Sequence, residues 1–468
     1  MGRGAVVRTN EGAEVKMKNS PKTAKGLSAT ALILLFILIA VFLTYMIPAG
    51  EFAPGFGEPL SVDSFVWTER RPVSLFAIPE LIVQSFLENA TVIFTFFFVG
   101  GSVGIMVQTG AMQKLVSWLL KKAKGRHFLI IAGFTCIFTF LSLNIAARYL
   151  VSFVPFMIAF FVTLGYDAIT GLAVVLLGSA MSYCTSPTGL MTLTAQSYVD
   201  LPPLSGAGFR WVCLLVLLAL TVGYIYIYAE KVRKKKIGGC PPPKKLPKLD
   251  ESGEGTSWRD GMIIGIYLVT IGFCVYYGSQ GSLSAMRMSA LFMVSAVAIA
   301  LVDKTSPNDV VDLYIQSAGR FFAPAMIVGF AGTIALVWES GGIVDTIVYG
   351  LTLSLQRFPN AVKAPAMFVI QSLINCAIVP GAGQAAVTMP LFGPAAELAG
   401  IPLQSAVLSF NFGDGIGDFV LPYSSVLVSY LAVGGVSFRA WWKFIWKLLV
   451  CWIFAASVLM YVSTIVWK

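Results

Sequence analysis

The sequence is poor in charged side chains. Asp, Glu, Lys and Arg make up 12% of its 468 residues, about half of the roughly 25% that is usual in globular proteins. Hydrophobic residues make up 57%, and the mean hydropathy is +0.80. Such a chain cannot cover a water-facing surface, which excludes secreted domains, cytosolic enzymes and nucleic-acid binders. Its long apolar runs indicate an integral membrane protein with many spans, embedded in a lipid bilayer.

Histidine and paired cysteines are scarce as well. His127 is the one histidine, and the seven cysteines contain no CxxC pair. A histidine-based metal cluster is therefore excluded, and a zinc site or a disulfide framework is not expected. The chain also has no HExxH motif, and it offers no Ser-His-Asp option beyond that single histidine. We expect neither an enzyme nor a bound cofactor.

The net charge of +10 has a plain cause in a membrane protein, because cytoplasmic loops collect Lys and Arg. The most basic segment, residues 231–248, contains four prolines and is expected to be a flexible cytoplasmic linker. Residues 110–127 are expected to form an amphipathic helix on the inner face, and residues 303–320 a loop. We expect a cytoplasmic N-terminus, an outside C-terminus and four parts: a cytoplasmic tail (1–26), a first transmembrane half (27–230), the basic linker (231–260) and a second transmembrane half (261–468).

The two halves show an internal repeat. Residues 155–187 match residues 390–422 at an offset of 235 positions, through four Gly or Pro pairs. Thr109-Gly110 similarly parallels Ser340-Gly341. The segments that follow these two dipeptides differ in charge, as opposite membrane sides would require. We therefore expect an inverted repeat, the architecture of secondary transporters. The four pairs are Pro155 and Pro390, Gly165 and Gly400, Gly178 and Gly413, and Pro187 and Pro422.

The apolar runs are interrupted at matching places in both halves. Residues 128–164 and 364–398 fit re-entrant helical hairpins, whose non-helical tips are tolerated only against protein or water. Residues 168–197 and 403–425 fit discontinuous helices broken at mid-membrane. A broken helix presents N–H groups that suit anions and carbonyl groups that suit cations. Such interruptions are the best sequence pointer to a transport site.

Three charged residues stand beside these interruptions. Arg148, at the first hairpin tip, is predicted to bind a substrate carboxylate; the alternative is a structural salt bridge to Asp414 or Asp418. Asp414 and Asp418 are spaced i, i+4 and are predicted to couple transport to a cation, as Na⁺ ligands or as proton carriers. Their alternative is a capping or salt-bridge role at the helix break.

Neutral polar residues cluster at the same interruptions. The alternative for them is hydrogen bonding between helices, which is common for Ser and Thr in membranes. Glu339, in contrast, is expected to lie at the membrane interface. The predicted substrate-binding residues, besides Arg148, are Ser142, Asn144, Ser186, Thr188, Gln384 and Thr388. The predicted ion-coupling residues, besides the two aspartates, are Asn144, Gly383 and Gly413.

Several motifs resemble the YfcC and C4-dicarboxylate anaerobic carrier family. The resemblance runs from about residue 27 to the C-terminus. It implies an all-α polytopic fold of the ion transporter superfamily, of elevator type with two re-entrant hairpins. It also implies a homodimer in the bacterial cytoplasmic membrane, driven by Na⁺ or H⁺. The motifs are Pro380-Gly-Ala-Gly-Gln-Ala-Ala-Val-Thr-Met-Pro390, Phe412-Gly-Asp-Gly415, Tyr45-Met-Ile-Pro-Ala-Gly-Glu51, Ala195-Gln196, Leu204-Ser-Gly206 and Phe209-Arg210.

The chain departs from the family pattern at the breaks. Ser186-Pro187-Thr188-Gly189 stands where the family has an Asn-Pro-Phe-Thr-like sequence, Asp418 stands where it has Asn, and Arg148 is unusual. The sequence nevertheless predicts a secondary active transporter of small carboxylates or amino acids, with a small organic anion or zwitterion as substrate. Na⁺ or H⁺ is the expected coupling ion. The alternatives are a substrate/product exchanger without net ion coupling, a channel and a membrane-embedded enzyme.

Overall fold

A computed structural model describes residues 29–53, 62–112, 114–115, 126–242, 257–280, 282–355, 357–378 and 381–467. Within them the fold is almost entirely helical, as predicted. The strands β1 (Gly50–Phe52) and β2 (Phe65–Trp67) form one short antiparallel pair, in which Gly50 faces Trp67. The N-terminal tail (1–26) and most of the expected surface helix at 110–127 lie outside the described residues.

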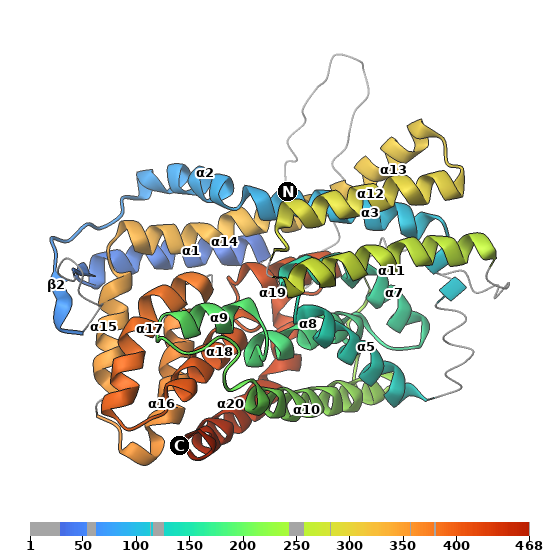
Figure 1. Ribbon diagram of the computed structural model, residues 1–468. Coiled ribbons are helices and arrows are strands. Elements are labelled where there is room, and N and C mark those ends of the chain that lie inside the picture. The colour runs from blue at the N-terminus through green and yellow to red at the C-terminus, as the bar shows by residue number, and fades with distance from the viewer. Residues whose placement is uncertain are drawn as a thin grey trace.

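The first half begins with a single long helix and continues through a helical hairpin, an interrupted helix and a further long helix (Figure 1). Its elements are α1 (Ala29–Met46), η1 (Val62–Ser64), η2 (Leu75–Ala77), α2 (Ile78–Glu88), α3 (Ala90–Gln108), α5 (His127–Ser142), α6 (Ala147–Leu150), η3 (Val151–Phe153), α7 (Val154–Thr163), α8 (Ala168–Thr185), α9 (Leu190–Ser197) and α10 (Ala207–Arg233).

The second half repeats this order of elements after one additional helix, α11. Its elements are α11 (Trp258–Ser279), α12 (Ala285–Asp303), α13 (Pro307–Gly319), α14 (Phe322–Ser340), α15 (Val344–Leu355), α16 (Asn360–Asn375), α17 (Gly381–Leu398), α18 (Leu403–Asp418), α19 (Ser425–Gly434) and α20 (Phe438–Val466). Seven of the described helices are long and apolar enough to cross a bilayer: α3, α8, α10, α11, α12, α14 and α20.

Two boundaries differ from the sequence-based expectation. The expected loop at 303–320 contains α13, which starts where the Ser306 side chain accepts a hydrogen bond from the backbone N–H of Asp309 and Pro307 fills the first helical position. Helix α10 continues to Arg233, three residues into the expected linker. Glu230 forms ion pairs with Arg233 and Lys234 that favour this extension.

Backbone geometry confirms the internal repeat. Helices α3 and α14 are both 19 residues long, and both of their ends differ by 232 positions. Each is followed by a glycine in the left-handed region, Gly110 (φ +77°) and Gly342 (φ +63°). Gly110 therefore corresponds to Gly342, one residue beyond the Gly341 with which the sequence comparison paired it. Gly165 (φ +80°) and Gly400 (φ +67°) make the equivalent turns before α8 and α18. Both of these helices then stop as predicted, and the chain resumes in α9 and α19.

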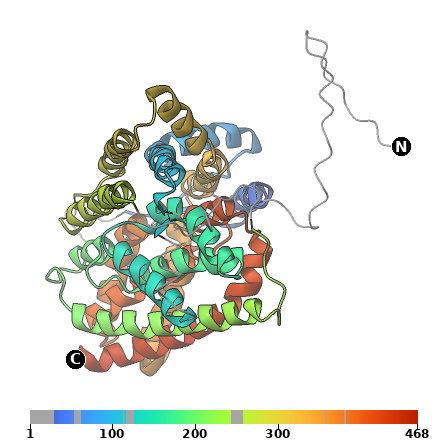
Figure 2. The same ribbon diagram turned by 90° about the vertical axis from the view of Figure 1, so that its right-hand side faces the viewer.

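Equivalent helices run in opposite directions, as an inverted repeat requires. Helices α10 and α20 lie side by side (Figure 2). Phe209 near the start of α10 packs on Trp467 just beyond the end of α20, with 5.2 Å between ring centroids. Further along α10, the Tyr224 ring lies 5.3 Å from the Phe444 ring near the start of α20. The two helices are therefore antiparallel.

The helices form two layers (Figure 1). In the upper layer, α14 packs on α1 and α2, and α3 packs on α12 and α13. The lower layer holds the hairpin helices, the interrupted helices and, at its outer edge, α10 and α20. At its centre α8 crosses α18, where a Cβ on Gly415 would lie 2.4 Å from the Cα of Cys184. A side chain at position 415 is therefore excluded.

Equivalent glycines make equivalent contacts with the hairpins. A Cβ on Gly178 of α8 would lie 2.8 Å from the carbonyl oxygen of Thr135 on α5. A Cβ on Gly413 of α18 would lie 2.5 Å from the Cβ of Gln371 on α16. Each interrupted helix thus sits directly against the first helix of its own hairpin, and only glycine permits that approach.

We predict that Gly413→Ala and Gly178→Ala each destabilise the protein by about 1–3 kcal/mol, because the added methyl group overpacks a backbone contact. The measurement is the thermal unfolding midpoint of the detergent-purified protein. Gly272→Ala on α11 is the control, since a Cβ there meets nothing within 4 Å and alanine favours helix. Equal midpoints for all three variants would contradict the close packing.

Candidate functional site

Two buried carboxylates lie one turn apart on α18. Asp414 is 1% exposed and Asp418 is 6% exposed, and α18 ends at Asp418. Their i, i+4 spacing is helical despite the intervening glycines. Isolated charges at such depth are costly unless they are paired or hydrogen-bonded. Their surroundings therefore decide what they can do.

A chain of amides holds Asp414. The Asn375 side-chain Nδ2 donates to Asp414 Oδ1 at 2.9 Å and to Gln384 Oε1 at 3.2 Å. Gln384 Nε2 in turn donates to Gln371 Oε1 at 2.8 Å and to the Gln371 carbonyl at 2.9 Å. All four side chains are almost completely buried. The network joins both arms of the second hairpin, α16 and α17, to α18.

Asp418 faces a cavity of about 290 Å³ in which the two hairpin tips meet. Arg148 comes from the first tip, Cys376 from the end of α16, and Tyr423 from the break between α18 and α19. The opposite wall is the stretch of α14 from Val328 to Glu339, together with Glu88. We call this space the Arg148 cavity. Its four ionisable carboxylate and guanidinium side chains are those of Arg148, Asp418, Glu88 and Glu339.

Arg148 is half-buried in this cavity. Among the described residues it has no carboxylate oxygen within 4.0 Å, so the salt bridge weighed as the alternative is not formed directly. Its charge still acts on Asp414 and Asp418 through space. A planar guanidinium aimed at a cavity suits a bidentate carboxylate ligand.

Several buried oxygens around α18 have no hydrogen-bond partner among the described residues. Buried polar atoms in proteins are nearly always paired, so each exception suggests a ligand. Carboxylate, amide and hydroxyl oxygens are the donors that hard cations prefer. Oxygens of all three kinds occur in this set, and their part in ion coupling stays a prediction. These atoms are Asp418 Oδ1, Asn375 Oδ1, Thr388 Oγ1 and Ser424 Oγ.

The remaining predicted residues are not all brought together. Thr188 is exposed. Asn144 lies against α11, where a Cβ on Gly278 would sit 2.3 Å from the Asn144 carbonyl oxygen. Ser142 is half-buried, and its Oγ has no partner among the described residues. Ser186 has a left-handed backbone (φ +39°), and its carbonyl accepts a hydrogen bond from Thr192 Oγ1 at 2.6 Å. Gly383 lies in α17.

Sequence reasoning missed some of the polar groups. Gln371 and Asn375 lie one turn apart on the face of α16 that packs on α18, a spacing that could have marked them. Asn411 donates to Thr192 Oγ1 at 2.8 Å and thereby links α18 to α9. Glu339 lines the Arg148 cavity although it is exposed. It lies near the end of α14, and its place at the membrane interface stays a prediction.

Arg210 of the Phe209-Arg210 motif joins separate segments of the fold by hydrogen bonds. Arg210 is fully buried, donates to the Ser205 carbonyl at 2.7 Å and donates to Gln404 Oε1 at 2.6 Å. Gln196 donates to the same Ser205 carbonyl at 2.8 Å. The motif residues thus tie the α9–α10 connection to the start of α18, away from the Arg148 cavity.

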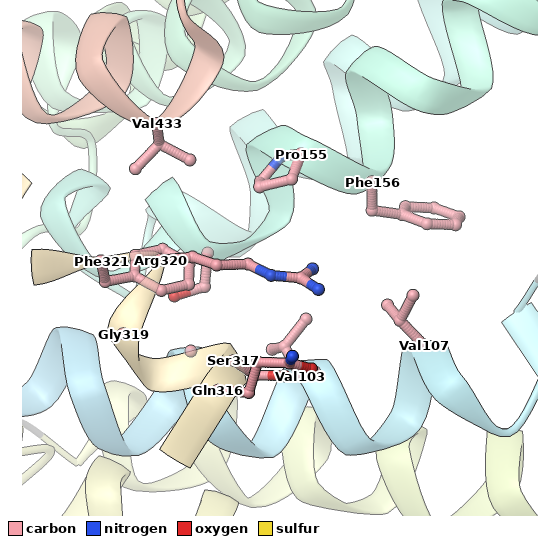
Figure 3. A pocket seen from close by; sticks show the side chains of 13 residues that line it. Val103, Val107, Pro155, Phe156, Gln316, Ser317, Gly319, Arg320, Phe321 and Val433 are labelled. Atoms are coloured by element: carbon pink, nitrogen blue, oxygen red, sulfur yellow. The ribbon is translucent and has the colours of Figure 1, made fainter. Parts of the chain in front are cut away.

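A second, larger cavity of about 690 Å³ lies between the two layers (Figure 3). One wall, in the lower part of Figure 3, comes from α3 and from the junction of α13 and α14, and the opposite wall, at the top, comes from η3, α7 and α19. Arg320 extends into it. We call this space the Arg320 cavity.

A bundle of apolar spans, built from an inverted repeat around two interrupted helices and a charged cavity, defines a multi-pass membrane transporter. The sequence agrees with this class. The chain belongs to the C4-dicarboxylate anaerobic carrier family, whose pattern it matches over residues 27–465.

Known proteins with similarity include two bacterial sequences. The Escherichia coli (strain K12) protein named "Putative basic amino acid antiporter YfcC" is 26% identical over 365 residues, covering 74% of this chain and 72% of its own. An uncharacterized Haemophilus influenzae protein is 24% identical over 407 residues, covering 82% of this chain and 78% of its own.

Two solved structures show more distant similarity. One is Neisseria gonorrhoeae MtrF, whose structure is reported as illuminating a class of antimetabolite efflux pumps, at a TM-score of 0.46, 16% identity and coverage of 95% and 96%. The other is the Alcanivorax borkumensis YdaH transporter, at a TM-score of 0.45 and 15% identity, with coverage of 93% of this chain and 98% of its own.

We predict that Asn375→Leu destabilises the protein by about 1–3 kcal/mol, because it leaves a buried Asp414 oxygen without its donor. Asp414→Leu in the same chain should recover part of this loss, because both partners are then apolar. Thermal unfolding midpoints of the two single variants and the double variant form the cycle. Losses that simply add would show that the two side chains do not interact.

Proposed function

We propose that the protein is a secondary active transporter of amino acids or closely related small carboxylates, with the Arg148 cavity as its substrate site. The observation that carries this proposal is the charge of the cavity, one guanidinium and three carboxylates. In the proposed mode Arg148 binds the substrate carboxylate, and Asp418 with Glu339 faces its ammonium group. The excess of carboxylates disfavours a dicarboxylate, because a second anionic group would meet like charge.

The coupling ion is proposed to be Na⁺ or H⁺, held at Asp414, Asp418 and the unpaired oxygens beside them. Both carboxylates are buried, so a cation that neutralises them removes most of the cost of their burial. Because Asp418 also lines the cavity, ion and substrate would share one carboxylate, which gives a direct physical basis for coupling.

An exchanger is the alternative that a specific observation favours. The name of the YfcC relative describes an antiporter, and a cationic substrate could replace the coupling ion at Asp418. The expected cytoplasmic N-terminus, outside C-terminus and homodimer remain predictions, as does the absence of an enzymatic activity and of a cofactor.

We predict that purified protein in proteoliposomes takes up amino acids under an imposed Na⁺ or H⁺ gradient. Arg148→Ala should lower uptake at least tenfold, since one charge-assisted carboxylate contact contributes about 1.5–3 kcal/mol. Asp418→Asn should remove the response to the gradient. Arg439→Ala is the matched control, because Arg439 is exposed and distant in sequence from both hairpin tips.

Uptake that ignores both gradients and also tolerates Arg148→Ala would refute the coupled model. Counterflow that persists without any gradient, while Arg148→Ala abolishes it, would replace coupled transport with exchange at the same site.

Alternating access is proposed to follow an elevator movement, with the two hairpins re-entering the membrane and moving with α8 and α18. The support is an asymmetry in packing. Helix α14 packs on α19, whereas its equivalent α3 packs on η3; the contacts of α14 with α1 and α2 match those of α3 with α12 and α13. Exchanging the roles of the repeats would place α3 against α9, the equivalent of α19.

We predict a cross-link that forms only in the alternative state. Ala335 and Val426 line one cavity in this structure, and their repeat equivalents are Val103 and Met191. In a cysteine-free background, Ala335→Cys with Val426→Cys should cross-link in the present state. Val103→Cys with Met191→Cys should cross-link only after the movement. Transport should stop in each cross-linked form; simultaneous cross-linking of both pairs in one molecule would rule out the movement.

A further inference from the structure

The Arg320 cavity contains a guanidinium that no carboxylate of the described residues neutralises. Arg320 follows α13, and Figure 3 shows its guanidinium extending between Phe156 and Val103 into the cavity. Within the described ranges it forms no ion pair at 4.0 Å or less. The polar groups that share the cavity, Gln316, Ser317 and Ser152, carry no charge.

One wall of the Arg320 cavity is the repeat equivalent of one wall of the Arg148 cavity. The Arg320 cavity is lined by four residues of α3, and the Arg148 cavity is lined by the four residues found 232 positions later on α14. The residues just before each helix also correspond, since Glu88 and Arg320 each stand two residues ahead of it. The four pairs are Gly100 and Gly332, Val103 and Ala335, Gly104 and Leu336, and Val107 and Glu339.

The equivalent positions differ in charge. Glu88 on one side corresponds to Arg320 on the other, and Glu339 corresponds to Val107. The fixed walls of the two cavities therefore have opposite sign, with two carboxylates beside the Arg148 cavity and one guanidinium beside the other. A low-dielectric cleft lined by one sign of charge concentrates the opposite charge. Because the repeats run in opposite directions, such equivalent walls belong to opposite faces of a membrane.

We propose that the Arg320 cavity is the second entrance of the transport path and that Arg320 makes it a binding site for small organic carboxylates, whereas the Glu88–Glu339 wall selects ammonium groups. The role of this cavity as an entrance rests on the proposed transport function, whereas its charge selectivity does not. A carrier with such walls binds its substrate differently from the two faces. The carboxylate group of the substrate enters first at one face, and its ammonium group enters first at the other.

Charged thiol reagents test the selectivity without knowledge of the substrate. Single cysteines are placed at the equivalent positions, Val103→Cys and Ala335→Cys, in a cysteine-free full-length chain. Each is labelled with an anionic (sulfonatoethyl) and a cationic (trimethylammonium-ethyl) methanethiosulfonate. We expect the anionic reagent to react about threefold or more faster at position 103, and the cationic reagent to be favoured similarly at position 335.

Charge variants assign these preferences to residues. Arg320→Gln should abolish the anion preference at position 103 and leave position 335 unchanged, whereas Arg320→Lys should retain it. Glu88→Gln with Glu339→Gln should abolish the cation preference at position 335 alone. Equal reactivity of both reagents at both cysteines, or preferences that ignore these variants, would overturn the proposal.

Sidedness separates this proposal from the proposed function. The reagents do not cross the bilayer, so in vesicles of known orientation the two cysteines should react from opposite faces. Labelling of both from one face would refute the second entrance. Opposite preferences at opposite faces, in a protein that takes up no amino acid, would uphold the entrances and overturn only the substrate assignment.

Discussion

Asp414 is fully buried in an apolar bundle, and an uncompensated charge there would cost several kcal/mol. The structure meets this cost locally, because Asn375 donates to Asp414 while Gln384 and Gln371 hold Asn375 in place. These three amides come from both arms of the hairpin α16–α17. The carboxylate that is proposed to bind the coupling cation thus also fixes the hairpin to α18, so that cation binding would depend on the position of the hairpin.

Glycine makes this arrangement geometrically accessible. The approach of α16 to α18 requires Gly413, and the crossing of α8 with α18 requires Gly415, because a methyl group at either place would overlap the neighbouring chain. The interrupted helices then stop where their partners cross. Backbone N–H and carbonyl groups released at the breaks remain inside protein, where the irregular backbone is tolerated in a membrane. The composition of the interrupted helices therefore allows both their close packing and their breaks.

Much of the fold was predictable from sequence, because long apolar runs, proline breaks and matched glycines act locally. The repeat, both hairpins and both helix breaks follow from residues such as Pro155, Gly165 and Pro187, whereas Pro390, expected to interrupt the second hairpin, lies inside α17. The charged pair on α18 and Arg148 were singled out because charge inside an apolar run stands out. The structure places Arg148 and Asp418 on one cavity, and their roles stay predictions. Gln371 and Asn375 were missed because uncharged amides in a helix look like ordinary helix–helix contacts. Glu88 was missed because its place in the cavity depends on α2 packing across α14 from the other half of the chain.

The inverted repeat gives the two halves one backbone plan, but it does not give them one chemistry. The carboxylate-bearing break lies in α18, where Asp414 and Asp418 stand. At the equivalent break after α8, the carbonyl oxygen of Ser186 instead accepts a hydrogen bond from Thr192 Oγ1. The walls differ in the same way, with Glu88 on one side and Arg320 on the other. In the proposed elevator movement, a symmetric backbone would let one moving unit fit two positions, and asymmetric charge would make those positions unequal in energy for a charged substrate. Different substrate affinities at the two faces of such a carrier would then originate in a few wall residues, while the gradients set the direction of net transport.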